Sequence, residues 1–161
     1  MKNVIRRQIA LPLQAAGFRP APERQLRSGE GRRLAVEVVY TTDEGTQYAI
    51  RKAWGLARDL GAQVRIVFMC AVPYTLPLAK PAISLPFLQN KLVKLASDFP
   101  GEASVHIFLC RETLRALQNA LPPGSVVVLG GRRRRWWPTQ GQRMERRLQE
   151  MGHQVIFADS E

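Results

Sequence analysis

The residues with the clearest chemical potential stand at a glycine-containing turn. Gly130 and Gly131 follow the most apolar run of the chain, and Gly141 with Gln142 opens a helix-like pattern farther on. Glycines let a backbone approach phosphate oxygens closely, while a helix N-terminus supplies N–H donors and the positive end of its dipole. Arg132 adds a cation beside the turn. This segment predicts a phosphate or nucleotide site.

A purely structural interpretation of the same residues is also open. Gly130 and Gly131 would then do no more than turn the chain. Thr139 and Gln142 have the Thr-x-x-Gln spacing of a capping box, in which each side chain accepts from a backbone N–H group of the other residue. The glycines and the cap would then serve the start of the last helix rather than a ligand.

Arginine and tryptophan crowd the loop between these glycines. Arginine pairs with phosphates, and tryptophan stacks on bases or sits at the headgroup boundary of a bilayer. The loop therefore predicts a surface for a polyanion, either RNA or DNA or an anionic membrane; the alternative is a solvated loop whose tryptophans cover the sheet edge or a dimer contact. The candidate polyanion surface consists of Arg132, Arg133, Arg134, Arg135, Trp136, Trp137, Arg143 and Arg147.

Other chemistry finds little support in the sequence. His106 and His153 stand apart from each other and from any cluster of cysteines or carboxylates, so we expect no metal site. No serine lies in a Gly-x-Ser-x-Gly elbow, and no general acid and base pair is apparent. Cys70 and Cys110 end strand-like runs, and we expect buried free thiols, although neighbouring strand ends could bring them together. We therefore expect no enzymatic activity.

Five strand-like runs alternate with four helix-like runs and must position these residues. Strands of this kind, joined by helices of ten or more residues, predict an α/β fold: a five-stranded parallel sheet with helices on both faces. Ligands of such sheets bind beyond the carboxyl ends of the strands, here the loops 41–43, 70–74, 110–113 and 130–142. The strand-like runs are 34–40, 63–70, 104–110, 125–129 and 154–158.

This order of elements resembles the universal stress protein family over about residues 34–159. The resemblance implies an adenine nucleotide alpha hydrolase-like fold and a site for ATP or another adenine nucleotide. ATP-binding members carry Gly-x-x-Gly, nine residues, then Gly-Ser or Gly-Thr after the fourth strand, and an Asp after the first. The site residues that the resemblance and the neighbouring loop positions imply here are Thr41, Asp43, Gly130, Gly131, Arg132, Gly141 and Gln142.

The match to that motif is incomplete. If Gly130 is the first glycine of the motif, Arg133 replaces the second; if Gly131 is the second, Val128 replaces the first. Gln142 replaces the hydroxyl residue, and the aspartate lies two residues later than its family counterpart. We therefore expect a divergent domain with a modified nucleotide site that is weak or lost.

Positive charge is concentrated in two segments. The 161 residues carry a net charge of +11, to which residues 1–33 and residues 132–147 contribute +6 each. Such segments beside a nearly neutral remainder are typical of contact with an anionic partner; the alternative is that they only keep the protein soluble. Prolines and glycines in 1–33 predict a flexible basic arm ahead of a domain spanning 34–161. Residues 1–11 could instead form a short amphipathic helix or a mitochondrial targeting segment.

The remaining expectations concern setting and partners. No apolar run is long enough to cross a membrane, and two cysteines favour a reducing, cytoplasmic setting. The expected function is a universal-stress-protein-like regulatory or binding domain, and the resemblance implies a homodimer that pairs through its last strand. The alternatives are a basic nucleic-acid-binding module, using the arm and the Arg-Trp loop, and a peripheral module on an anionic membrane or a transporter.

Overall fold

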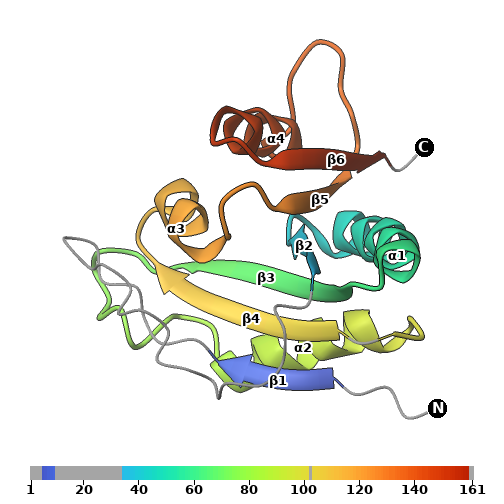
Figure 1. The fold of residues 1–161 in the computed structure, drawn as a ribbon. Helices are drawn as coiled ribbons and strands as arrows, with labels where there is room; N and C mark the ends of the chain where they lie inside the picture. Colours follow the sequence, from blue (N-terminus) through green and yellow to red (C-terminus); the bar gives the residue numbers. More distant parts are fainter. Residues whose placement is uncertain (1–4, 10–33, 102, 160–161) are drawn as a thin grey trace.

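The computed structural model describes residues 5–9, 34–101 and 103–159. Within them lies one six-stranded parallel sheet in the order β1-β4-β3-β2-β5-β6 (Figure 1). The strands are β1 Ile5–Ile9, β2 Ala35–Val39, β3 Gln63–Ala71, β4 Ala103–Cys110, β5 Val126–Gly131 and β6 Gln154–Asp159. The helices are α1 Asp43–Leu60, α2 Leu85–Ser97, α3 Thr113–Ala120 and α4 Gln140–Glu150.

The five strands and four helices predicted from the sequence are confirmed, and the structure adds one strand. β1 lies inside the segment predicted to be an arm and pairs with β4, with Ile5 opposite Ala103 and Ile9 opposite Ile107. The amphipathic helix considered for residues 1–11 is therefore not formed over Ile5–Ile9. The rest of that segment, 1–4 and 10–33, lies outside the described residues. Charged residues are common on edge strands, so the Arg-rich sequence of β1 hid its strand character.

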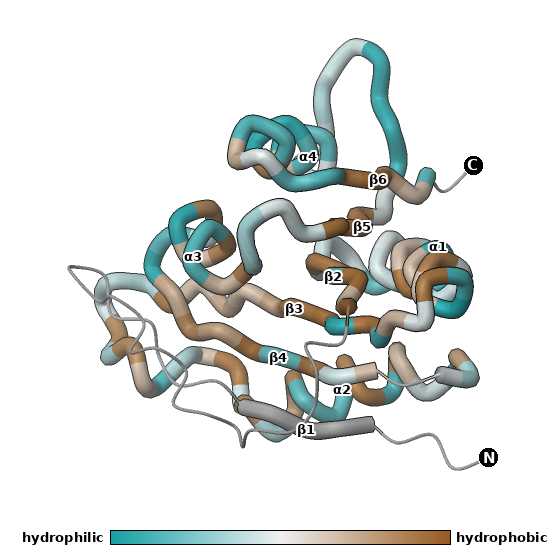
Figure 2. Tube along the Cα trace, viewed as in Figure 1, coloured by the Kyte–Doolittle hydropathy of each residue, from teal (hydrophilic) through white to brown (hydrophobic). Residues whose placement is uncertain are grey.

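The helices form one layer on each face of the sheet (Figure 1). α1 and α2 cover one face over a core that includes Val36, Val38 and Ile66, while α3 and α4 cover the other over a core that includes Val39 and Leu129. Alternate residues of a strand point to opposite faces, and both faces carry buried apolar residues here, which is why β2 and β5 are predominantly apolar (Figure 2). Two helix layers thus fix the sheet rigidly.

The connections change direction at β2. From β2 the chain continues through β3 to β4 on one side, and then crosses to β5 and β6 on the other. β2 consequently pairs with both β3 and β5, and the helices that follow β2 and β5 lie on opposite faces. The carboxyl ends of β2 and β5 form the crevice at which parallel α/β sheets bind ligands.

A row of polar side chains crosses the α3 face of the sheet. Arg65 donates to Glu37, with 2.7 Å between Nε and Oε2, and its Nη2 donates to the carbonyl oxygen of Ala120 at 2.9 Å. Burial raises the pKa of Glu37, and the Arg65 charge opposes that rise. His106 continues the row beside Ser104, with 3.1 Å between Nε2 and Oγ. Burial, and secondarily the charge of Arg65, lower the pKa of His106 to about 4.

His106 should therefore make the fold acid-sensitive. An unfolded chain takes up the histidine proton near pH 6.5 and the folded chain only near about pH 4, so stability is full above this window and falls as the pH is lowered through it. His106→Leu should show a smaller loss of unfolding free energy across this window than the parent, measured by urea denaturation. Ser104→Ala keeps the imidazole and should keep the parental dependence. An unchanged pH profile in His106→Leu would refute this assignment.

Candidate functional site

A pocket of about 350 Å³ occupies the crevice at the carboxyl ends of β2 and β5. We call it the β2–β5 pocket. Its walls come from the loop after β2, the first turn of α1, the end of β5, the loop that follows, and the first turn of α4. It is lined by Thr41, Thr42, Glu44, Gly45, Gly130, Gly131, Arg132, Arg134, Thr139, Gln140 and Gly141.

Gly130 and Gly45 form the back of this pocket in backbone contact. A Cβ atom placed on Gly130 would lie 1.7 Å from the carbonyl oxygen of Gly45, and a Cβ on Gly45 would lie 2.5 Å from that of Gly130. The Thr41 hydroxyl donates to the Gly130 carbonyl at 2.6 Å. Gly130 is therefore required for packing α1 against β5, independently of any ligand.

The N-terminus of α1 is capped by the side chain of Thr42. The Thr42 hydroxyl accepts from Gly45 N at 3.0 Å, and the Thr46 hydroxyl accepts from Thr41 N at 3.3 Å. Glu44 brings a carboxylate to the pocket and lies 4.0 Å from the guanidinium of Arg132, both side chains being exposed. The Glu44 carboxylate therefore makes this side of the pocket less favourable for an anion, although the first-turn N–H group of Glu44 has no acceptor within its own helix.

The N-terminus of α4 carries the capping box. Thr139 Oγ1 accepts from Gln142 N at 3.4 Å, and Gln142 Oε1 accepts from Thr139 N at 2.9 Å. The structural interpretation of Thr139 and Gln142 is therefore confirmed. First-turn N–H groups have no acceptor within their own helix, so Gln140 and Gly141, which both line the pocket, present two such groups beside it.

Gln142 has a second task that its sequence position did not reveal. Its Oε1 also accepts from the backbone N–H of Arg134 at 3.0 Å, and its Nε2 donates to the Arg134 carbonyl at 3.2 Å. The amide thus holds the loop that leads into α4, and Gln142 does not line the pocket.

Asp43 points away from the other predicted nucleotide-site residues. Its Oδ1 accepts from the hydroxyl of Tyr40 at 2.6 Å and lies 2.9 Å from Nζ of Lys91 on α2. The hydrogen bond from Tyr40, followed by that from Lys91, lowers the pKa of Asp43. Of the seven residues predicted for the nucleotide site, Thr41, Gly130, Gly131, Arg132 and Gly141 line the pocket, whereas Asp43 and Gln142 do not.

The Arg-Trp loop, residues 132–138, projects from the sheet between β5 and α4 (Figure 1). Its base is anchored by Arg133, whose guanidinium lies 2.9 Å from Glu145 and 4.5 Å from the centre of the Phe157 ring. Trp136 and Trp137 are 83% and 79% exposed. They therefore do not cover the sheet edge, which was one interpretation of the sequence.

The predicted polyanion surface is divided in space. Arg132 and Arg134 turn toward the β2–β5 pocket, while Arg135 lies over the ring of Trp136 at 5.9 Å from its centre. Arg143 and Arg147 lie on α4 and line a separate groove against α3. The loop tryptophans and the α4 arginines thus do not line one shared pocket.

Other candidate chemistry is sparse in the part of the chain that the structure describes. No group of three or more His, Cys, Asp or Glu residues there could hold a metal ion. Cys70 and Cys110 are buried free thiols, and burial raises the pKa of each. No helix among the described residues is long and apolar enough to span a bilayer.

Comparison with solved structures gives the fold an identity. The structure of a universal stress protein from Archaeoglobus fulgidus matches with a TM-score of 0.53 and 15% sequence identity, over 77% of this chain and 92% of that one. The fold is universal-stress-protein-like. No protein-family model matches the chain, and no curated protein matches it in sequence. The resemblance read from the order of elements is thereby confirmed as a likeness of fold.

Sequence reasoning missed Glu44 and Gly45, which lie outside the predicted loops, and did not single out Gln140 within the loop 130–142. A signal for Gly45 was present, because a glycine inside the first turn of an amphipathic pattern costs helix stability and usually marks a close approach. Gln140 had no such signal, since it contributes through its backbone position at the start of α4.

Gly130→Ala should destabilise the protein by about 1–3 kcal/mol, because the new methyl group would meet the Gly45 carbonyl inside a packed contact. Gly55→Ala is the matched control: it adds the same methyl group in the middle of α1, where nothing lies within 4 Å, and should stabilise by about 1 kcal/mol. Urea denaturation midpoints measure both. Equal stability of Gly130→Ala and the parent would contradict the packing role.

Proposed function

We propose that this chain is a universal-stress-protein-like regulatory or binding domain whose β2–β5 pocket takes the phosphates of ATP or another adenine nucleotide weakly, without turnover. The observation that carries the proposal is the composition of the pocket. It combines the first-turn N–H groups at Gln140 and Gly141 with the guanidinium groups of Arg132 and Arg134. Helix N-termini and arginines are the two devices with which proteins hold phosphate.

Three features support weak binding. Glu44 places a carboxylate at the pocket, where it repels a phosphate and competes for Arg132. Gln142 supplies an amide committed to the helix cap where a hydroxyl would otherwise reach a phosphate. Asp43 is engaged by Tyr40 and Lys91. The modified positions thus have structural duties that replace ligand contacts.

The groups that line the pocket support the proposed absence of turnover. A general base must lie within hydrogen-bond reach of the attacking water. Among the residues lining the pocket, Glu44 is the sole carboxylate, and none is a histidine or cysteine. The Glu44 carboxylate faces Arg132 at 4.0 Å, which favours its role as a counter-ion over that of a base.

Calorimetry with ATP tests the proposal directly. We expect a dissociation constant in the high micromolar range or weaker, a loss of about threefold to tenfold in Arg134→Gln, and a gain of similar size in Glu44→Gln. Arg58→Gln, on the exposed side of α1, changes the net charge equally and should leave the affinity unchanged. Submicromolar binding, or steady phosphate release that Arg134→Gln abolishes, would contradict the proposal.

A second candidate function is binding of single-stranded nucleic acid by the Arg-Trp loop. The specific observation in its favour is that two neighbouring tryptophans are almost fully exposed at a projecting loop surrounded by arginines. Exposed aromatic rings stack on unpaired bases, and arginines neutralise phosphates. Arg133 is set aside from this surface because it anchors the loop.

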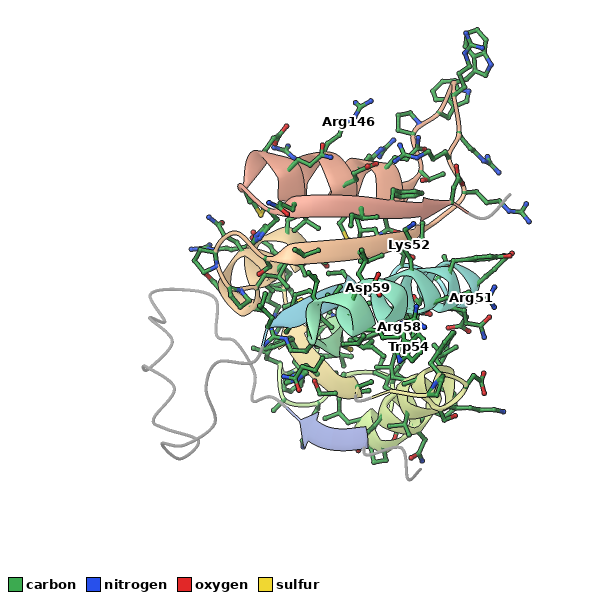
Figure 3. The ribbon with its side chains drawn as sticks, turned by 45° about the vertical axis from the view of Figure 1, so that its right-hand side comes forward. Arg51, Lys52, Trp54, Arg58, Asp59 and Arg146 are labelled. Carbon is green, nitrogen blue, oxygen red and sulfur yellow. The ribbon has the colours of Figure 1, made fainter. Side chains whose placement is uncertain are left out.

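Salt dependence separates this candidate from a solvated loop. Replacing Arg132, Arg134 and Arg135 by Ser should lower the affinity for single-stranded RNA and flatten its dependence on log salt by roughly 0.7 per lost phosphate contact. Trp136→Ala and Trp137→Ala should lower the affinity without changing the slope. Serine at Arg51, Lys52 and Arg58 on α1 is the control of equal charge (Figure 3). If the loop variants bind single-stranded RNA as tightly as the parent does, this function is excluded. If the variants lose affinity for anionic vesicles but not for RNA, the loop binds a membrane surface instead.

We also propose a cytoplasmic homodimer. Among the described strands, β6 stands at the edge of the sheet and pairs only with β5, so its outer edge offers backbone groups to a second copy. The buried free thiols of Cys70 and Cys110 suit a reducing compartment. Light scattering at tens of micromolar should give twice the 18.1 kDa mass of the chain, and a purely monomeric mass would refute the pairing.

A further inference from the structure

A second hollow lies between α3 and α4, on the face of the sheet opposite α1. Its volume is about 500 Å³, and of its lining residues only Gln140 is shared with the β2–β5 pocket. We call it the α3–α4 groove. The groove is lined by Thr113, Leu114, Gln140, Arg143, Met144, Arg146, Arg147 and Glu150, so three arginines face a single carboxylate.

The groove has an apolar floor that continues into the core. Met144 is buried and belongs to the same core cluster as Leu117 and Leu148. Leu114, on the first turn of α3, lies 38% exposed beside it. An aliphatic group placed on this floor would leave water for a surface that already contacts packed side chains.

Three guanidinium groups stand around that floor. Arg143, Arg146 and Arg147 are exposed on α4, because the pattern that turns Met144 and Leu148 inward turns these positions outward. Arg147 pairs with Glu150 at 3.2 Å. Arg143 and Arg146 pair with no carboxylate among the described residues. Like charges three and four residues apart destabilise a helix, so this spacing is hard to explain by stability alone.

The first turn of α3 also borders the groove. Its N-cap residue, Glu112, makes no side-chain cap hydrogen bond, and Thr113, which follows, lines the groove. The positive end of the α3 dipole therefore stands at the groove, with the exposed carboxylate of Glu112 beside it, so the arginines of α4 supply most of the positive charge.

We propose that the α3–α4 groove binds a small amphipathic anion: an aliphatic body that carries a phosphate or carboxylate head. Arginines recognise both heads through paired N–H donors, while Leu114 and Met144 receive the body. A volume of about 500 Å³ suits a small molecule. None of the described residues that line the groove is aromatic, so they offer no stacking platform for the bases of a nucleic acid. This site goes beyond the nucleotide pocket proposed above.

Octyl phosphate, titrated below its micelle concentration and followed by calorimetry, tests the proposal. It should bind about tenfold or more tightly than inorganic phosphate, which lacks the body, and octanol, which lacks the head, should not bind measurably. The double variant Arg143→Gln/Arg146→Gln should weaken binding about tenfold or more. Leu114→Glu, which places a carboxylate beside the floor at an exposed position, should do the same.

The matched control is Arg51→Gln/Arg58→Gln on α1. It removes the same charge on the other side of the sheet, as the positions of Arg51, Arg58 and Arg146 in Figure 3 show, and it should keep the parental affinity. Anionic vesicles distinguish two sources of the anionic head group. If the vesicles compete with octyl phosphate, the head group belongs to a membrane lipid; if they do not compete, it belongs to a free small molecule. The groove is the binding site in both cases.

The proposal is overturned if octyl phosphate and inorganic phosphate bind with equal affinity, or if both groove variants bind octyl phosphate as tightly as the parent does. It is also overturned if octyl phosphate does not bind at all and the groove variants lose affinity for single-stranded RNA. ATP titration separates this site from the nucleotide pocket. Arg134→Gln should weaken ATP and spare octyl phosphate, whereas Arg143→Gln/Arg146→Gln should do the reverse. Either site can thus fail while the other stands.

Discussion

The close approach of Gly45 and Gly130 determines how the two halves of this molecule meet. Neither residue has room for a side chain, so the first turn of α1 rests directly on the last residues of β5. The hydroxyl of Thr41 secures the contact by donating to the Gly130 carbonyl. This contact joins α1 to β5 beside β2, where the strand order changes direction, and both glycines line the crevice that a ligand at the switch point would enter.

A glycine shared between folding and binding complicates the interpretation of a sequence motif. Gly130 could be mistaken for a phosphate-cradle residue, because both roles demand the absence of a side chain. In the structure Gly130 packs against Gly45 and also lines the pocket, so the packing contact alone already requires a glycine at this position. Similarly, Gln142 serves the helix and the loop rather than the pocket.

The fold could be predicted because its information is local and repeated. Apolar strands such as Val126–Leu129, helical stripes, and turn residues such as Gly61, which adopts the left-handed C-cap conformation of α1, each indicate the same α/β order. β1 escaped prediction because an edge strand needs little apolar sequence.

The candidate site was harder to predict than the fold. The loop ends were placed correctly, but the direction of Asp43 depends on the hydroxyl of Tyr40 and on Lys91, a residue of another helix whose position no local pattern encodes. The α3–α4 groove likewise exists only once two distant helices lie side by side.

The double duty of Gln142 has a thermodynamic consequence. One amide satisfies the N-cap of α4 and fixes the backbone of Arg134, so the loop cannot leave its place without breaking hydrogen bonds at the end of the helix. Displacing the loop and fraying the first turn of α4 therefore break the same hydrogen bonds, and the free energies of the two changes are coupled. A ligand that orders this turn from the pocket side would therefore also stabilise the backbone of Arg134 at the base of the Arg-Trp loop.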